Sequence, residues 1–228
     1  MVDVELEDAV ARIFLNRPEK ANALNSAMLS ALAAALESLD LATLRIVVIA
    51  GRGRNFCGGA DAAELKALVP ANAGAFVEKI HQVCARIRGL PVPVVAKLHG
   101  AVIGAGLEIA AACDLRVAAE GTKFSMPEVR LGIPSVVEAA LLPRLMGSGR
   151  AAWLVLTGEA IDARRALEWG LIEEVSDGET LLARLLSNDL QALRMQKQLL
   201  QLWEEAPLAT SIAASIERFA HSYRGNRT

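Results

Sequence analysis

The segment Ile46–Ala50 is the feature that most limits the folds open to this chain. Its five residues are all apolar and four of them are β-branched, which predicts a strand buried on both faces of a sheet. Pro93–Val102 is expected to be a second buried strand. A helical pattern over Ser26–Leu39 precedes the first of these strands, and another over Ala75–Ile87 lies between the two. Because strands that alternate with helices favour parallel crossovers, the predicted fold class is α/β.

Helical patterns dominate the chain from Ser135 onward. Asp162 is expected to cap a helix over Ala163–Trp169, and two helices flank Pro207. No internal repeat, low-complexity run or clear linker interrupts the sequence. The 228 residues suffice for one domain with a full core. We therefore expect a single domain over residues 1–228, with a core over about residues 1–176 and a shortened helical C-terminal part over 177–228.

The charge of the chain is nearly balanced, with 24 Lys and Arg against 26 Asp and Glu. This balance argues against a nucleic-acid partner, which would favour a strong basic excess. Prolines and charged residues break the apolar stretch 92–113 before it reaches the roughly 18 residues of a membrane-spanning helix. The acidic start argues against a signal peptide. The odd, widely spaced cysteines predict free thiols, no disulfide or metal site, and a cytoplasmic location.

Three segments hold the residues best suited to chemistry. Residues 55–61 (NFCGGAD) form a glycine-containing loop between a strand and a helix. Residues 99–108 (HGAVIGAGLE) form a strand-to-helix turn and place Glu108 one turn inside the helix. Residues 123–134 (KFSMPEVRLGIP) contain a second carboxylate, Glu128. Each segment alone is weak evidence for a site, because a glutamate near a helix start is usually a favourable contact with the helix dipole.

Together, these segments resemble the enoyl-CoA hydratase/isomerase (crotonase) family. The resemblance begins at 16–24 (NRPEKANAL) and continues beyond the three segments at 142–147, 156–159 and 169–172. It covers about residues 10–176 and implies a crotonase-like spiral of ββα units with a helical C-terminal region. It also implies an acyl-CoA thioester substrate and a homotrimer or a dimer of trimers. No metal or redox cofactor is implied, and coenzyme A enters only as part of the substrate.

The chemistry shared by that family is stabilisation of an enolate formed from a thioester. Preorganised backbone N–H groups at a helix start can stabilise such an oxyanion. By comparison with the family, these donors belong to Ala60 and Ala105, and the spacing of three residues puts Glu108 on the same side of the helix as Ala105. The substrate-binding positions that the resemblance implies are Ala23, Ala60, Asp61, Ala62, Ala63 and Ala105.

Hydratases of the family have a second glutamate twenty residues after the first, which is Glu128 here. Two carboxylates on opposite sides of one water suit its addition to a conjugated double bond. The apolar neighbours of Glu108 are expected to raise its pKa. Reversible hydration of a 2-enoyl-CoA is therefore the leading function. The alternatives are enoyl-CoA double-bond isomerisation and a non-catalytic acyl-CoA-binding or assembly subunit; no Ser/His pair in a motif favours a serine protease.

Four departures from the family pattern bear on this interpretation. The turn has Ala105 where most relatives have glycine, which requires a negative φ there. Ala63 replaces a lysine near the nucleotide, and the C-terminal part is abbreviated. Residues 135–138 are Ser-Val-Val-Glu in place of small residues, and Glu138 is expected to be an acid on a helix surface, with a role in substrate choice or acid–base chemistry as the alternative. Asp114 is expected to pair with Arg116 or cap a turn.

Coenzyme A is strongly anionic, so Arg and Lys side chains are the candidates for contact with its phosphates. All of these candidates lie in the first hundred residues. These candidates are Arg17, Lys20, Arg52, Arg54, Lys66 and Lys97.

Overall fold

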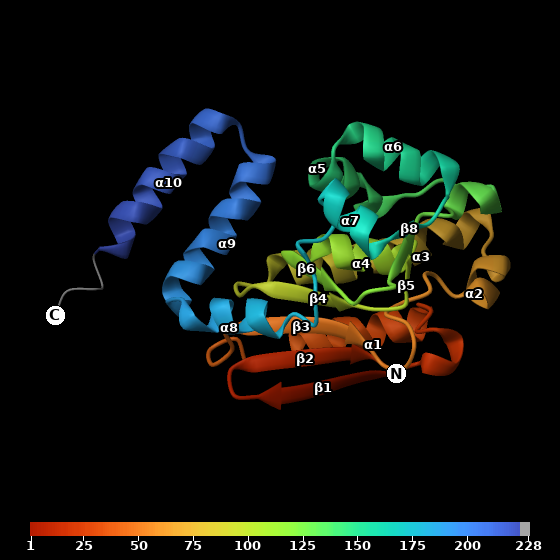
Figure 1. Ribbon diagram of the computed structural model, residues 1–228, viewed down its shortest axis with the longest axis horizontal. Helices are drawn as coiled ribbons and strands as arrows, with labels where there is room; N and C mark the ends of the chain where they lie inside the picture. The colour runs from red at the N-terminus through yellow and green to blue at the C-terminus, as the bar shows by residue number, and fades with distance from the viewer. Residues whose placement is uncertain (224–228) are drawn as a thin grey trace.

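The computed structural model describes residues 1–223, and its main sheet has six strands in the order β1-β2-β3-β4-β6-β9. β1 is antiparallel to β2, and the remaining neighbours are parallel. Figure 1 shows these strands as one twisted layer with helices around it. The strands are β1 (Val2–Glu7), β2 (Val10–Leu15), β3 (Ile46–Gly51), β4 (Val94–Leu98), β6 (Leu115–Ala118) and β9 (Glu174–Val175).

The apolar strand β3 is buried on both faces, as its sequence predicts. Val47 and Ile49 pack into the large core that lies under the helices on one face. Ile46 and Val48 point to the other face, where they form a smaller cluster with Leu182 of α8 (Glu179–Ser187). Alternate residues of a strand point to opposite faces, so a strand between two helical layers has no solvent-facing position and needs apolar side chains throughout.

The predicted strand Pro93–Val102 is wrong in one respect, because it is two strands in two sheets. β4 belongs to the main sheet, whereas β5 (Ala101–Ile103) pairs with β7 (Lys123–Ser125) in a small sheet completed by β8 (Ile161–Asp162). The chain turns at Gly100, which has a φ of +59° and lies against the backbone of Arg54. A side chain would not fit there, so the glycine lets the chain leave the first sheet.

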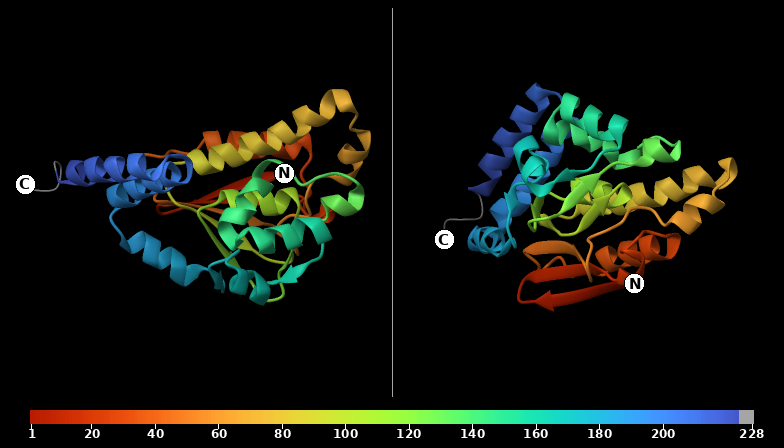
Figure 2. Two further views of the ribbon diagram at one scale, coloured as in Figure 1. Left: turned by 90° about the horizontal axis from the view of Figure 1, so that it is seen from above. Right: turned by 45° about the vertical axis from the view of Figure 1, so that its right-hand side comes forward.

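The helices agree with the sequence patterns to within a few residues at their ends. α4 runs through the middle of the molecule with every residue buried (Figure 2). Asp162 caps α7 by accepting from the N–H of Arg165, and Pro207 separates α9 from α10, as expected. The helices other than α8 are α1 (Ser26–Glu37), α2 (Ala62–Ala67), α3 (Pro70–Gly89), α4 (Ala105–Ala112), α5 (Leu142–Met146), α6 (Ser148–Thr157), α7 (Ala163–Trp169), α9 (Leu190–Glu205) and α10 (Leu208–Ser222).

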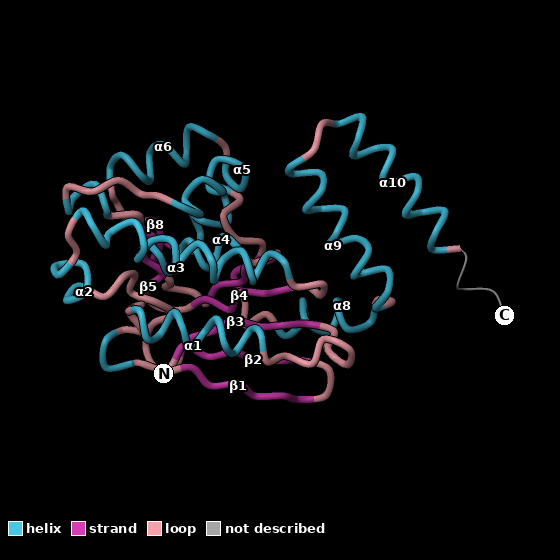
Figure 3. The backbone as a smooth tube through the Cα atoms, turned by 180° about the vertical axis from the view of Figure 1, so that it is seen from behind, coloured by secondary structure: helices cyan, strands magenta, loops and turns pink. Residues whose placement is uncertain are grey.

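The last two helices form an antiparallel pair that stands beside the body of the molecule (Figures 1 and 3). α10 packs on α9 and leaves exposed the apolar side chains of Leu208, Ile212, Ile216 and Phe219. Their spacing of three to four residues puts them on one face of the helix. Among the described helices, none has the length and apolar character needed to cross a membrane.

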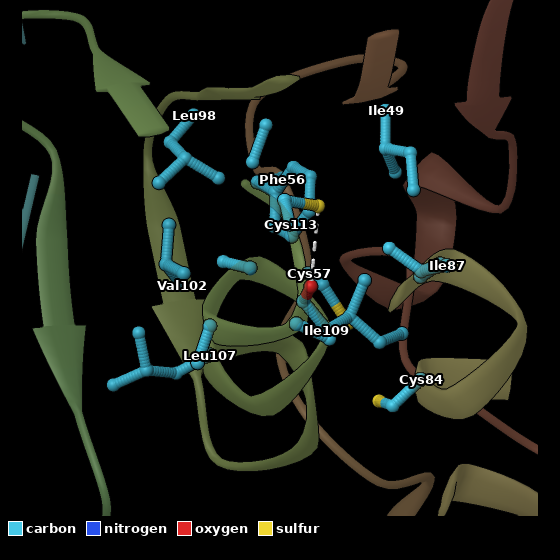
Figure 4. Packing of buried hydrophobic residues seen from close by; sticks show 14 of the residues in the cluster. Ile49, Phe56, Cys57, Cys84, Ile87, Leu98, Val102, Leu107, Ile109 and Cys113 are labelled. Atoms are coloured by element: carbon cyan, nitrogen blue, oxygen red, sulfur yellow. Dashed lines mark hydrogen bonds between the residues drawn. The ribbon is translucent and has the colours of Figure 1, made fainter. Parts of the chain in front are cut away.

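The three cysteines are buried and free, which confirms the predicted absence of a disulfide. Figure 4 shows Cys57 and Cys113 in the core near α4 and Cys84 on α3; Cys113 donates to the carbonyl of Ile109. Burial raises the pKa of both Cys57 and Cys113 to about 12. At neutral pH they are small core side chains with protonated thiols.

Candidate active site

The loop 55–61 is held against β5 by backbone hydrogen bonds. The N–H of Cys57 donates to the carbonyl of Ala101, and the N–H of Ile103 donates to the carbonyl of Cys57, each at 3.0 Å. Gly106 makes this approach possible, because a Cβ there would lie 2.7 Å from Cβ of Cys57. The loop and the start of α4 therefore advance side by side in a fixed register.

The buried side chain of Asn22 fixes the other side of this loop, a role that sequence reasoning missed. Its amide group donates to the carbonyls of Arg52, Asn55 and Phe56 at 2.9, 2.8 and 3.2 Å, and its oxygen accepts from the N–H of Arg17. Because every one of these partners is backbone, Asn22 ties its own turn, which begins at Arg17, to the loop 52–56. The signal available in the sequence was an amide side chain within the motif 16–24, since such a side chain needs hydrogen-bond partners if it is buried.

This register brings Ala60 and Ala105 to the ends of two adjacent chain segments. Among residues 1–223, the backbone N–H groups of Ala60 and Ala105 donate to no acceptor. Ala105 is the first residue of α4 and has no positive φ, whereas Gly104 before it takes the positive φ of +51°. The alanine in place of glycine is therefore accommodated without strain. Two unused donors, one of them at the start of α4, can bind a developing negative charge.

Glu108 lies in the first turn of α4 with only 5% of its surface exposed. Burial, and then the charges of Glu128 and Glu138, raise its pKa from 4.5 to about 8, while the backbone N–H of Ala139 opposes the shift. Glu128 and Glu138 are thus each close enough to Glu108 to repel its negative charge. A carboxyl group with such a pKa can hold or release a proton at neutral pH.

Glu128 reaches the same place from the 3₁₀ turn Glu128–Leu131. Its Oε1 lies directly over Gly104, so that a side chain at position 104 would overlap it. Its Oε2 accepts a hydrogen bond of 2.9 Å from the hydroxyl of Ser135. The structure therefore brings Glu108 and Glu128 together beside Ala105, and Ser135 is a positioning residue in the segment that departs from the family pattern.

The expectation that Glu138 is a helix-surface acid is wrong. Its side chain is 7% exposed and bonds the Nδ1 of His81 on α3 at 2.8 Å. It lies on the 3₁₀ turn Val137–Leu141, which packs against α3 and α4. Val137, with a φ of +42°, turns the chain inward just before it. Sequence reasoning missed His81 because the pattern of α3 gives no signal that its histidine meets a buried acid.

The remaining predicted positions lie around Asp61, which caps α2 by accepting from the N–H groups of Ala63 and Glu64. Arg17 pairs with Asp61 at 2.6 Å and lowers the pKa of that carboxyl. Ala23 is half-buried, and its carbonyl accepts from the same guanidinium. Ala60 is half-buried next to them, whereas Ala62 and Ala63 are exposed on the first turn of α2.

The basic candidates for phosphate contact divide into two groups. Arg17 pairs with Asp61, Arg52 pairs with Asp3 and Glu5, and Lys97 pairs with Glu179, so these three are engaged within the chain. For residues 1–223, no ion pair is formed by Lys20, Arg54 or Lys66. Those three residues keep their charges available to an anionic ligand.

Asp114 is structural, but its expected pairing with Arg116 is wrong. Asp114 accepts from the Nζ of Lys197 at 2.8 Å and from the N–H of Val94, so it links α9 to the sheet. Arg116 pairs instead with Glu173 at 2.6 Å. Lys197 is nearly completely buried, and a buried ammonium requires a partner of opposite charge.

Within the described part of the chain, no group of three or more His, Cys, Asp or Glu side chains could hold a metal ion.

Comparisons with known proteins agree with the resemblance in the sequence. The family model described as enoyl-CoA hydratase/isomerase matches residues 5–222. The chain is 35% identical to a crotonyl-CoA hydratase of Syntrophomonas wolfei over 85% of this chain and 78% of that protein. It is 37% identical to a 1,2-epoxyphenylacetyl-CoA isomerase of Escherichia coli over 77% and 70%.

The fold of this chain also matches that of a solved structure. The crystal structure of an enoyl-CoA hydratase from Thermoplasma volcanium superposes with a TM-score of 0.93 at 31% identity, covering 99% of this chain and 93% of that one. This agreement confirms the predicted crotonase-like architecture. The chain therefore belongs to the enoyl-CoA hydratase/isomerase family, and it is an enzyme of that family with the crotonase fold.

Proposed function

We propose that this enzyme catalyses the reversible hydration of a 2-enoyl-CoA to a 3-hydroxyacyl-CoA. The observation that carries the proposal is the placement of two carboxylates, Glu108 and Glu128, beside two N–H groups that donate to no acceptor among residues 1–223. Coenzyme A is part of the substrate, and we propose that the reaction needs no further cofactor. The cytoplasmic location expected from the sequence is part of the same proposal.

The thioester oxygen would lie between the backbone N–H groups of Ala60 and Ala105. When water adds to the double bond, negative charge develops on this oxygen. Donors that are already oriented stabilise this charge without reorganisation, and mutational losses at comparable sites are about 10²–10³ in rate. The N-terminus of α4 adds its positive dipole end to the same point.

The two carboxylates divide the proton transfers. Glu128, oriented by Ser135, accepts a proton from the attacking water as its oxygen bonds to the β-carbon. Glu108 is mostly protonated at neutral pH because its pKa is about 8, and it donates its proton to the α-carbon. One water molecule is consumed, and the product carries the new hydroxyl and the new C–H bond. The reverse order gives dehydration.

A second candidate is isomerisation of a 3-enoyl-CoA to the 2-enoyl form. The raised pKa of Glu108 favours it, because a single group that takes a proton and returns it two carbons away is sufficient. The presence of Glu128 as a second carboxylate beside Glu108 favours hydration instead. The two activities need different substrates, so they can be measured separately.

The test uses purified enzyme with crotonyl-CoA, followed by loss of the absorbance of its conjugated thioester, and in parallel with a 3-enoyl-CoA. We expect hydration, with a fall of about 10²–10⁴ in kcat for both Glu108→Gln and Glu128→Gln. The matched control is Glu168→Gln, an exposed position on α7. Wild-type turnover by both variants would contradict the proposal. Calorimetric binding of coenzyme A without any turnover would identify a non-catalytic acyl-CoA-binding subunit.

We also propose that the enzyme assembles as a homotrimer or as a dimer of trimers. The exposed apolar face of α10 supports this assembly, since Leu208, Ile212, Ile216 and Phe219 have no cover within residues 1–223. Light scattering with size-exclusion chromatography should give three or six times the chain mass of 24.2 kDa. An Ile216→Asp variant should form an assembly of lower mass than the wild type. A monomeric wild type would contradict the proposed trimeric or hexameric assembly.

A further inference from the structure

The pair formed by His81 and Glu138 extends from solvent to the buried acids of the site. The side chain of His81 is 49% exposed, whereas that of Glu138 is 7% exposed. Their 2.8 Å contact joins the Nδ1 of the ring to Oε1 of the carboxylate. An open cavity of about 530 Å³ lies outside the pair and is lined by both residues, with Arg88 and Glu205 at its rim. The outer end of the pair is therefore accessible to water and small solutes.

The inner oxygen of Glu138 turns away from His81. Oε2 is buried and has no hydrogen-bond partner among the described residues. A buried charged oxygen without a hydrogen-bond donor costs free energy. No contact among the described residues compensates for this cost at Oε2. With no donor bonded to it, this oxygen is free to take up a proton and pass it on.

Glu138 and Glu108 are neighbours across the contact between the 3₁₀ turn and α4. The thiol of Cys84 on α3 is close to both, because the charges of Glu138 and Glu108 each add to the rise of its pKa. The 3₁₀ turn that carries Glu138 packs directly on α4, which carries Glu108, and the charge of Glu138 adds to the rise of the pKa of Glu108. Around Glu138, the titratable groups are thus His81 and Cys84 from α3, Glu108 from α4, and Glu128 beyond it.

We propose that His81 and Glu138 form a proton relay between solvent and the carboxyl group of Glu108. The inference rests on the proposed function, in which Glu108 loses its proton to the substrate in each hydration. Without a route to solvent, a carboxylate with 5% exposure regains that proton only from the substrate side. The relay gives it a second route that stays open while a thioester covers the site.

Each step of the relay moves one proton and breaks no other bond. Water outside the protein gives a proton to Nε2 of His81, and the ring releases the proton on Nδ1 to Oε1 of Glu138. The neutral carboxyl of Glu138 turns about its Cγ–Cδ bond and gives the proton to the carboxylate of Glu108. His81 returns to its neutral form with the proton on the other nitrogen, and exchange with water restores the first tautomer. The sum is one proton moved from water to Glu108, and the cycle closes when Glu128 returns to water the proton that it took from the attacking water molecule.

The test measures exchange of the α-hydrogens of butanoyl-CoA in D₂O by proton NMR, because this saturated thioester can be deprotonated but not hydrated. The wild type should exchange label. His81→Ala and Glu138→Gln should each lower the exchange rate tenfold or more, while KM for crotonyl-CoA changes less than twofold. Imidazole added to His81→Ala should restore exchange through the open cavity, but it should not restore Glu138→Gln. His221→Ala, an exposed histidine on α10, is the matched control and should exchange at the wild-type rate.

The outcomes separate the relay from the function on which it rests. If the wild type hydrates crotonyl-CoA and His81→Ala exchanges label as fast as the wild type, the relay is wrong and the proposed function stands. If His81→Ala is slow but imidazole restores nothing, His81 only supports the fold and the relay is again wrong. If the wild type neither hydrates nor exchanges, both proposals fall.

Discussion

The substitution Glu108→Gln tests the energetic cost of the buried acid directly. Glu108 has a pKa of about 8 in the folded protein, against 4.5 for an ordinary glutamate. The folded state thus holds a proton that the unfolded state releases between about pH 4.5 and pH 8. The unfolded chain binds fewer protons in this range, so the free energy of unfolding falls as the pH rises through it. Glutamine has nearly the same shape and no charge, and it removes this dependence.

The magnitude follows from the two pKa values. Their full difference corresponds to about 5 kcal/mol. At about pH 5 the folded protein holds Glu108 neutral and the unfolded chain is only partly protonated, which leaves a cost of about 1 kcal/mol. Raising the pH to about 9 brings the cost close to its full value. We therefore expect the stability gained by Glu108→Gln to grow by up to about 4 kcal/mol between these two conditions.

Urea denaturation followed by circular dichroism at several pH values measures this quantity, with the free energy extrapolated to zero denaturant. Glu168→Gln on the exposed face of α7 is the control, and its effect should not depend on pH. Activity should change in the opposite direction, because the variant cannot donate a proton. A stability difference between Glu108→Gln and the wild type that is equal at pH 5 and pH 9 would refute the argument that burial and neighbouring charges hold Glu108 neutral.

Three further predictions concern the surroundings of the site. Gly104→Ala should lower the free energy of unfolding by about 1–3 kcal/mol, because φ is positive there. It should also lower kcat, because a Cβ would displace Glu128. Chemical denaturation measures the first effect and steady-state kinetics the second. Ser135→Ala should lower kcat for hydration by about tenfold with little change in KM, because Glu128 loses the donor that orients it; an unchanged kcat would contradict this. The three cysteines should resist a disulfide reagent at neutral pH until the protein unfolds, since they are buried with raised pKa values.

The parts of the fold that the sequence predicts well are those governed by local patterns. β3 is recognisable because a strand covered on both faces has no polar position, and α7 is recognisable by the cap at Asp162. The division of Pro93–Val102 into two strands depends on how Gly100 packs against the backbone of Arg54, which is far from it in sequence. Such a contact leaves no periodic signal in the chain.

The same distinction holds for the site. The resemblance to the family identifies Glu108 and Glu128 as two acids of one site. The environment of Glu138 depends on three elements that meet only in the folded chain, namely its own 3₁₀ turn, α3 and α4. A polar residue in a helical pattern is exposed by default, so its burial could be learned only from the structure.

The three acids are tolerated together because each has a different means of reducing repulsion. Glu108 is held mostly neutral at neutral pH, and Glu128 accepts from Ser135. Glu138 has His81 at its outer oxygen and, within the described residues, no partner at its inner one. The charges of Glu128 and Glu138 disfavour a charged Glu108, so this arrangement is most stable while Glu108 keeps its proton. In the proposed hydration Glu108 gives up that proton while Glu128 gains one from the attacking water, so the repulsion that favours a neutral Glu108 also favours its reprotonation before the next turnover.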